Sequence, residues 1–138
     1  MSYKFLEHTT DAFIEVTASN LKEAFTLAGQ SVVDTTFDRS TIEEKEQKTL
    51  SVSGKDLRYL LLNWLEEINF YLITKGFAIR RFELDMKKND EYQITANVFG
   101  EPVDLDKHNF KVEIKSPTFH LMDIKQEEKV TLRFLLDL

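Results

Sequence analysis

The sequence has 138 residues, of which 42% are hydrophobic and 12% aromatic, so it can bury the core of one domain and is not a disordered chain. The absence of cysteine excludes disulfides, thiolate metal sites and cysteine nucleophiles. The formal charge of −6, from 18 basic and 24 acidic residues, argues against a surface built mainly to neutralise phosphates and favours proteins or cations as partners.

The N-terminal region does not have the pattern of a signal peptide, because the charged residues Lys4 and Glu7 interrupt its apolar residues. Further along, no apolar run approaches the length needed to span a membrane. We therefore expect a cytoplasmic protein.

A polar motif at residues 7–11, Glu-His-Thr-Thr-Asp, lies between the apolar run 3–6 and a strand-like run at 13–18. At the other end of the sequence, Asp137 precedes Leu138, so a second acidic side chain lies beside the terminal carboxylate. If the last strand runs beside the first, the oxygen groups of Asp11, Asp137 and the terminus meet at one point. We hypothesise that these groups bind a divalent cation, because hard cations prefer oxygen ligands.

Two helices are predicted. Asn20 can cap the first, with Glu23 at the spacing of a capping box, and the apolar periodicity continues to about residue 33. The second helix is predicted from Asp56 to about Thr74, where apolar residues follow one helical stripe. Its apolar character continues around the helix, which predicts either a wide core face or a second buried side at an interface. The residues outside the stripe are Leu62, Phe70, Tyr71 and Ile73.

Strands are predicted at residues 13–18, 49–53, 77–86, 92–99, 110–115, 118–125 and 130–137. Residues 100–102 are expected to end one of them, and Pro117 to interrupt pairing, because proline lacks a backbone donor. The connections after the second helix are too short for helical crossovers. The predicted fold is an α+β, two-layer sandwich, with a mixed, mostly antiparallel sheet and two helices packed on one face.

A set of motifs in fixed order along the chain resembles the archease family. Any one motif is weak, but their joint spacing is specific and covers essentially the whole of residues 1–138. The departures are Thr10, where the family more often has alanine, and Leu136 and Leu138, which replace other branched aliphatic residues. The motifs are FLEHTTD (5–11), LKEAF (21–25), LLNWL (61–65), GEP (100–102) with His108, EIK (113–115), TFH (118–120) and LDL (136–138).

The resemblance implies a single archease-like domain that acts as an accessory protein of the GTP-dependent tRNA-splicing RNA ligase. Such a protein promotes guanylylation of the ligase and its multiple turnover without itself being an enzyme. The resemblance also implies a divalent metal site formed by Asp11, Asp137 and Leu138, most often for Ca²⁺, with Mg²⁺ or Mn²⁺ as other candidates. The partner that it implies is the ligase, with tRNA as a candidate indirect partner; direct contact with RNA stays open, and we expect no membrane contact.

Two other functions stay open at this stage. One is an RNA-binding or chaperone-like modulator of tRNA-modifying enzymes, acting through Arg80, Arg81 and the pair Lys87 and Lys88. The other is a metal-dependent hydrolase that uses Asp11 and Asp137 around an activated water, although the sequence offers no convincing nucleophile or base for it.

The three histidines and one lysine have separate predictions. His8 is expected to orient the N-terminal motif, and His120 to be an ordinary sheet residue. His108 is expected to be exposed in a charged loop. Lys115, near Pro117, is expected to be solvated, with contact to a phosphate or an acidic partner as the alternative.

Overall fold

The computed structural model describes residues 1–6 and 10–138, and its helices and strands follow the predicted order closely. Two strands differ: the predicted strand at 110–115 is absent, and the apolar run at residues 3–6, which was not among the predicted strands, lies in the strand β1. The elements are β1 (Ser2–Leu6), β2 (Asp11–Ala18), α1 (Leu21–Thr36), the short 3-10 helix η1 (Arg39–Thr41), β3 (Glu46–Gly54), α2 (Leu57–Ile73), β4 (Phe77–Lys88), β5 (Tyr92–Pro102), β6 (Ser116–Gln126) and β7 (Val130–Asp137).

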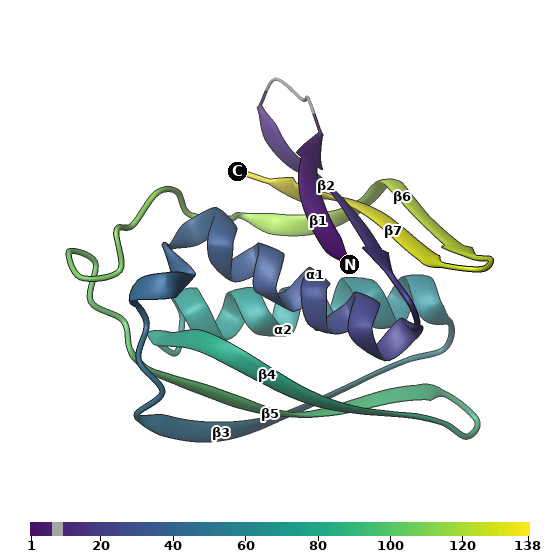
Figure 1. The fold of residues 1–138 in the computed structure, drawn as a ribbon, viewed down its shortest axis with the longest axis horizontal. Coiled ribbons are helices and arrows are strands. Elements are labelled where there is room, and N and C mark those ends of the chain that lie inside the picture. The colour runs from purple at the N-terminus through teal and green to yellow at the C-terminus, as the bar shows by residue number, and fades with distance from the viewer. Residues whose placement is uncertain (7–9) are drawn as a thin grey trace.

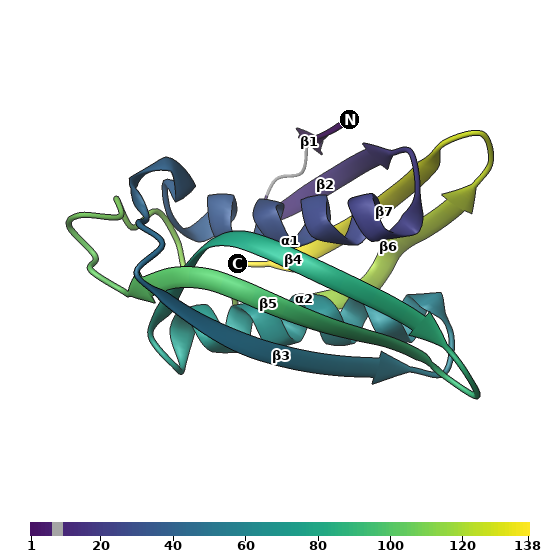
Figure 2. The same cartoon turned by 60° about the horizontal axis from the view of Figure 1, so that its bottom comes forward.

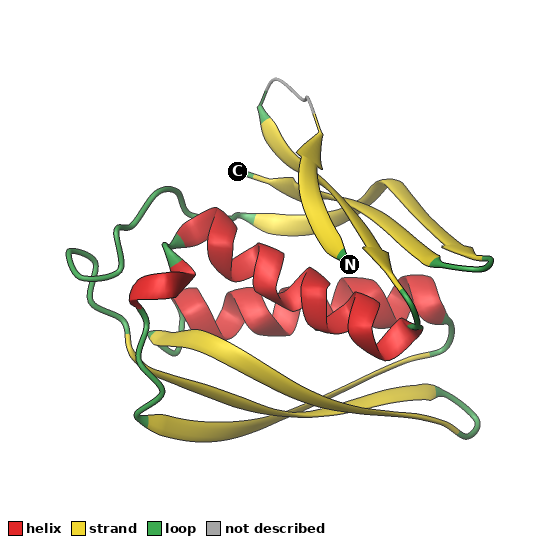
Figure 3. Ribbon diagram, in the orientation of Figure 1, coloured by secondary structure: helices red, strands yellow, loops and turns green. Residues whose placement is uncertain are grey.

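The strands form two antiparallel sheets, with the orders β1-β2-β7-β6 and β3-β5-β4. Figures 1 and 3 show both helices between these sheets, and each helix contacts both. Figure 2 brings the three-stranded sheet forward, with β3 at one edge. The predicted α+β class and antiparallel pairing are confirmed, but the strands divide between two sheets, which adds a third layer. The helices are apolar over too wide an arc for one sheet to cover.

Both helices begin where the sequence predicts, each directly after a capping residue. The side chain of Asn20 accepts a hydrogen bond from the backbone N–H of Glu23 at 2.8 Å, and Glu23 accepts one from the N–H of Ser19 at 3.2 Å. At α2, the side chain of Asp56 accepts from the N–H of Tyr59 at 2.9 Å. These caps satisfy donors that have no partner within a helix.

The core is formed by both helices and the strand faces that cover them, and Trp64 of α2 is fully buried in it. Its indole Nε1 donates a hydrogen bond to the carbonyl oxygen of Phe25 at 2.8 Å, which joins α2 to α1. Its ring meets that of Phe82 on β4 edge to face, with centroids 5.9 Å apart. A buried tryptophan is well accommodated when its N–H has such a partner.

The extra apolar residues of α2 have two different environments. Leu62, Tyr71 and Ile73 are half-buried and pack against the core, as a wide core face predicts. Phe70 is 43% exposed and lies on the outside of the helix.

Three local predictions after β5 are wrong. Residues 110–115 form no strand, because they contact separate elements: the N–H of Lys111 donates to the carbonyl of Thr36, and that of Lys115 to the carbonyl of Asp137. Residues 100–102 continue β5 rather than end it. Pro117 pairs with Leu136 at the start of the edge strand β6, where a missing donor is tolerated, and the irregularity follows between Thr118 and Asp123.

Among the described residues, no helix combines the length and the apolarity needed to cross a bilayer.

Candidate functional site

Asp11 and Asp137 lie directly opposite each other on the neighbouring antiparallel strands β2 and β7 (Figure 1). Along β2, the positions from Ala12 to Ala18 that face the helices are buried, whereas Asp11 belongs to the alternate, outward face. Directly opposed residues place their side chains on the same face of a sheet, with Cβ atoms roughly 5 Å apart. The strand pairing therefore brings two carboxylates from distant parts of the sequence together.

The same two strands carry a contrasting pair, Glu15 and Arg133, four residues along from Asp11 and on the same face. The Nε and Nη2 atoms of Arg133 each lie 2.7 Å from one carboxylate oxygen of Glu15. This hydrogen-bonded guanidinium, aided by Lys4, lowers the pKa of Glu15. Opposite charges stabilise such a cross-strand pair, whereas like charges directly opposite each other are destabilising. A cation held between Asp11 and Asp137 would remove that repulsion.

The described residues supply only part of a metal site. Within residues 1–6 and 10–138, no three side chains of His, Cys, Asp or Glu are grouped so that they could hold an ion. Leu138 directly follows Asp137 and is half-buried against the core, so its main-chain oxygens are near the end of β7. The predicted role of His8, like residues 7–9 as a whole, falls outside the described residues. Two carboxylates and main-chain oxygens fit a hard cation that keeps some water ligands.

Lys115 lies next to this pair. Its backbone N–H donates to the carbonyl oxygen of Asp137 at 2.8 Å, which fixes the segment before β6 against the end of β7. Its side chain is exposed and lines a surface hollow of about 460 Å³ between this segment and α2. The expected solvated lysine is confirmed, and its position is beside the candidate site.

Glu101 forms a second, very different acidic site that the sequence analysis missed. Its side chain is only 6% exposed and accepts a hydrogen bond from the backbone N–H of Glu43 at 2.8 Å. Lys107 Nζ lies 2.9 Å from one of its oxygens, and His108 Nε2 lies 3.0 Å from the same oxygen. Lys45 Nζ is 3.5 Å from the other. The donor from Glu43, followed by Lys107 and His108, lowers the pKa of Glu101 to about 2 despite its burial.

The prediction that His108 is exposed is wrong, because its side chain is fully buried. Its Nδ1 accepts a hydrogen bond from the N–H of Asp104 at 3.1 Å, so Nε2 carries the proton and donates to Glu101. Its ring also meets that of Phe37 edge to face. His108 therefore holds the loop after β5 against the body of the protein. The sequence contains one signal that could have indicated this pairing: an acidic residue before a proline, followed within one loop by a histidine.

The arginines proposed for RNA binding are largely engaged within the protein. Arg80 Nη1 donates to the carbonyl of Arg39 at 3.0 Å, and Arg39 returns a hydrogen bond to the carbonyl of Arg80. Arg81 pairs with Glu83 and Glu44, which raises its pKa, and its guanidinium lies 4.0 Å from the ring centroid of Phe99. These contacts reduce the number of cations available to a phosphate backbone.

His120 lies exposed on β6, in the irregular part of its pairing with β7. Its backbone N–H donates to the hydroxyl of Thr118 at 3.1 Å. The structure does not bring His120 into either acidic site.

The comparison with protein families matches residues 3–138 to the Archease protein family. "Protein archease" of Pyrobaculum islandicum is 35% identical, covering 99% of this chain and 95% of its own length. "Protein archease" of Methanopyrus kandleri is 33% identical, covering 93% and 92%, and "Protein archease-like" of Drosophila melanogaster is 30% identical, covering 92% and 82%. The solution structure of Methanobacterium thermoautotrophicum protein 1598 superposes with a TM-score of 0.83 at 28% identity, over 99% of both chains.

Proposed function

Because this chain belongs to the archease family, we propose that it is an accessory protein of the GTP-dependent tRNA-splicing RNA ligase and promotes guanylylation and multiple turnover of that enzyme. In this proposal the chain is not itself an enzyme. Its partner is the ligase, and tRNA is affected only through the ligase.

The observation that carries the proposal is the direct opposition of Asp11 and Asp137 on β2 and β7. The sequence separates these residues by nearly its full length, yet the fold places them as one pair on an outward face. Such a placement is mildly unfavourable for two like charges and becomes favourable once a cation is shared. An outward position also lets a partner contribute ligands.

Asp11, Asp137 and the main-chain oxygens of Leu138 would hold a divalent cation, most readily Ca²⁺, with Mg²⁺ or Mn²⁺ as alternatives. The bound ion would supply positive charge for the phosphate oxygens of the nucleotide in the ligase. The role of Asp11 and Asp137 is to position that charge, and the rigid strand pair holds them in register. Lys115 lies beside them and would add a second positive charge near the same phosphates.

The test is a guanylylation and multiple-turnover assay of the ligase with the wild-type chain, Asp11→Asn, Asp137→Asn and the control Glu15→Gln. Asparagine keeps the shape of aspartate and removes its charge, so we expect each of the first two variants to reduce stimulation by about 100-fold. The control, which changes the opposed pair on the same two strands, should stimulate normally. Normal stimulation by both asparagine variants would refute the metal-site mechanism.

The same assay tests the alternatives through its ligase-free controls. RNA hydrolysis by the chain alone would indicate a metal-dependent hydrolase. Salt-dependent RNA binding by the chain alone would indicate an RNA-binding or chaperone-like module. No observation in the described residues favours either alternative over the ligase accessory role.

A further inference from the structure

The four edge strands of the two sheets differ in how well they are protected against pairing with another chain. An edge strand exposes unpaired backbone groups, and proteins usually protect it with charges, bulges or a covering segment. β4 has a register shift between Ile79 and Arg81, and η1 contacts it through Arg39. β6 has its own irregularity, and Leu121 there has a φ of 62°. β1 is short and carries a charged residue near its middle.

β3 is less protected along its central part, where Asn63 of α2 contacts the carbonyl of Ser53 but no bulge or charged residue interrupts residues 49–53. Its register with β5 is regular from the pair of Glu46 with Gly100 to the pair of Gly54 with Tyr92. Residues 49–53, Thr-Leu-Ser-Val-Ser, include no charge and no proline. Such a segment is suited to accept an additional strand.

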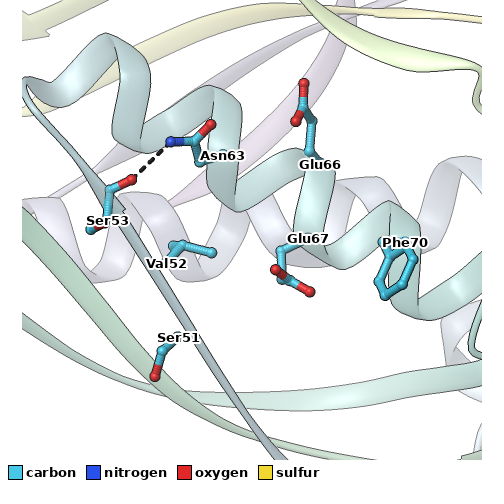
Figure 4. Close-up of a pocket in the computed structure, with 7 residues that line it drawn as sticks. All are labelled: Ser51, Val52, Ser53, Asn63, Glu66, Glu67 and Phe70. Atoms are coloured by element: carbon cyan, nitrogen blue, oxygen red, sulfur yellow. Dashed lines mark hydrogen bonds between the residues drawn. The ribbon is translucent and has the colours of Figure 1, made fainter.

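The direction of the backbone groups follows from one hydrogen bond. Asn63 on α2 donates through Nδ2 to the carbonyl oxygen of Ser53 at 2.8 Å, so this carbonyl points away from β5 (Figure 4). In an antiparallel ladder both backbone groups of a residue point the same way, and the direction alternates along the strand. The N–H and C=O groups of Ser51 and Thr49 therefore also point away from β5, toward the free edge.

A groove of about 620 Å³ runs along this edge between β3 and α2. Figure 4 shows Ser51 and Ser53 on the strand side, and Glu67 and Phe70 on the helix side. The groove thus combines backbone hydrogen-bonding groups on one wall with a partly exposed aromatic ring on the other. These are the features that bind an extended peptide: main-chain pairing and a contact for alternate side chains.

The charge of the groove is acidic. Glu66 and Glu67 are the charged residues that line it, and neither has an ion-pair partner within residues 1–6 and 10–138. The neighbouring lysines lie over aromatic rings at the two ends of α2, Lys55 over Tyr59 and Lys75 over Phe70. Two carboxylates without partners favour a cationic occupant.

We propose that this groove binds an extended, Lys- or Arg-bearing segment of a partner protein, which pairs with β3 as an added strand. The backbone of Ser51 and Thr49 supplies the hydrogen bonds, Glu66 and Glu67 select the basic side chains, and Phe70 contacts an apolar side chain between them. The proposal does not rest on the metal site or on the ligase, because a different face and different residues carry it.

The test uses the full chain and two capped peptides, Thr-Lys-Val-Lys-Val-Thr and its analogue with glutamate in place of lysine. Amide NMR shifts and hydrogen exchange of the protein follow binding. We expect the lysine peptide to bind at least about tenfold more tightly than the glutamate analogue, and to shift and protect the amides of Ser51 and Thr49. Absence of binding by the lysine peptide up to millimolar concentration, or equal binding of the two peptides, would overturn the proposal.

Two variants locate the binding. Ser51→Pro removes an outward N–H while leaving the hydrogen bonds to β5, so it should fold and weaken lysine-peptide binding by about tenfold. The double variant Glu66→Lys with Glu67→Lys should weaken it at least as much, whereas the control Glu128→Lys, on the turn of the other sheet, should not. Unchanged peptide affinity in both groove variants would refute the proposed site. Pairing of two copies of the chain through the edge of β3, so that the peptide cannot bind, would also refute it.

Discussion

Glu101 and the pair of Asp11 with Asp137 are acidic sites with opposite surroundings. Glu101 is buried and has a backbone donor, two ammonium groups and an imidazole around its two oxygens. Asp137 is exposed, and the residue directly opposite it on β2 is another carboxylate. A buried charge is tolerated only when it is fully paired, whereas an exposed pair of like charges costs little enough to be kept for a ligand.

This difference separates a structural carboxylate from a candidate functional one. The donors around Glu101 come from two segments outside β5, so the carboxylate joins the loop after β5 to the segment before β3. Asp11 and Asp137 come from two strands that are already joined by their ladder. Removing Glu101 should therefore damage the fold, and removing the exposed carboxylate of Asp137 should mainly damage cation binding.

The largest expected effect is the loss of stability on Glu101→Gln. The substitution leaves Lys107 and His108 without the carboxylate that pairs with them, so we expect the free energy of unfolding to fall by about 3 kcal/mol. Urea unfolding measures this change, with the exposed Glu113→Gln as the matched control. A loss no larger than that of the control would contradict the structural role of Glu101.

Lowering the pH should reveal the contribution of ionised Glu101 to the stability of the wild-type protein. The pKa of Glu101 is lowered from 4.5 to about 2, so its contribution to stability is complete above pH 4.5 and is lost as the pH falls toward 2. The difference in pKa corresponds to roughly 3 kcal/mol. Urea unfolding across this pH range should show wild type losing more stability than Glu101→Gln. Parallel losses in the two proteins would show that other groups control acid unfolding.

Calcium should distinguish the aspartate pair from Glu101. At a Ca²⁺ concentration about 100 times its dissociation constant, binding should stabilise the wild-type chain by about 2.7 kcal/mol, which a thermal melt detects. Asp137→Asn should lose this response and, in chelator, should be more stable than wild type by about 0.5 kcal/mol because the repulsion is removed. An Asp137→Asn protein that responds to Ca²⁺ as wild type does would contradict the proposed ligand.

The smallest effect is expected at Glu15, which forms an oppositely charged pair with Arg133 on the same two strands as Asp11 and Asp137. Its partner Arg133 is 47% exposed, so Glu15→Gln should cost about 0.5 kcal/mol at low salt and less at high salt. Urea unfolding at two salt concentrations measures this difference. A cost that does not change with salt would indicate that packing, rather than charge, is lost.

Local signals explain what the sequence predicted well. Asn20 and Asp56 each cap a backbone N–H three residues ahead, so both helix starts depend only on neighbours in the chain. The segment 110–115 has the alternation of a strand, but a strand also needs a partner along its length. Its backbone instead bonds singly to Thr36 and to Asp137, and no local pattern encodes that. The division into two sheets is likewise a property of pairings between distant segments.

The candidate site shows the same limit. Asp11 and Asp137 could be chosen from the sequence, but their opposition depends on the pairing of β2 with β7, which the sequence analysis could only assume. Glu101 was noted only as a motif residue, and His108 was predicted to be exposed because its loop is charged. Their burial depends on a loop that folds back so that each polar group meets a partner, and this closure is visible only in three dimensions.

The position of Trp64 has a practical consequence for all of these measurements. It is the only tryptophan in the chain, and its indole is enclosed between the helices with its N–H bonded to Phe25. Its fluorescence emission should therefore lie at short wavelength in the native protein and move to longer wavelength only when the helical layer opens to water. This built-in optical probe reports on the centre of the molecule and should be silent to cation binding at the end of β7.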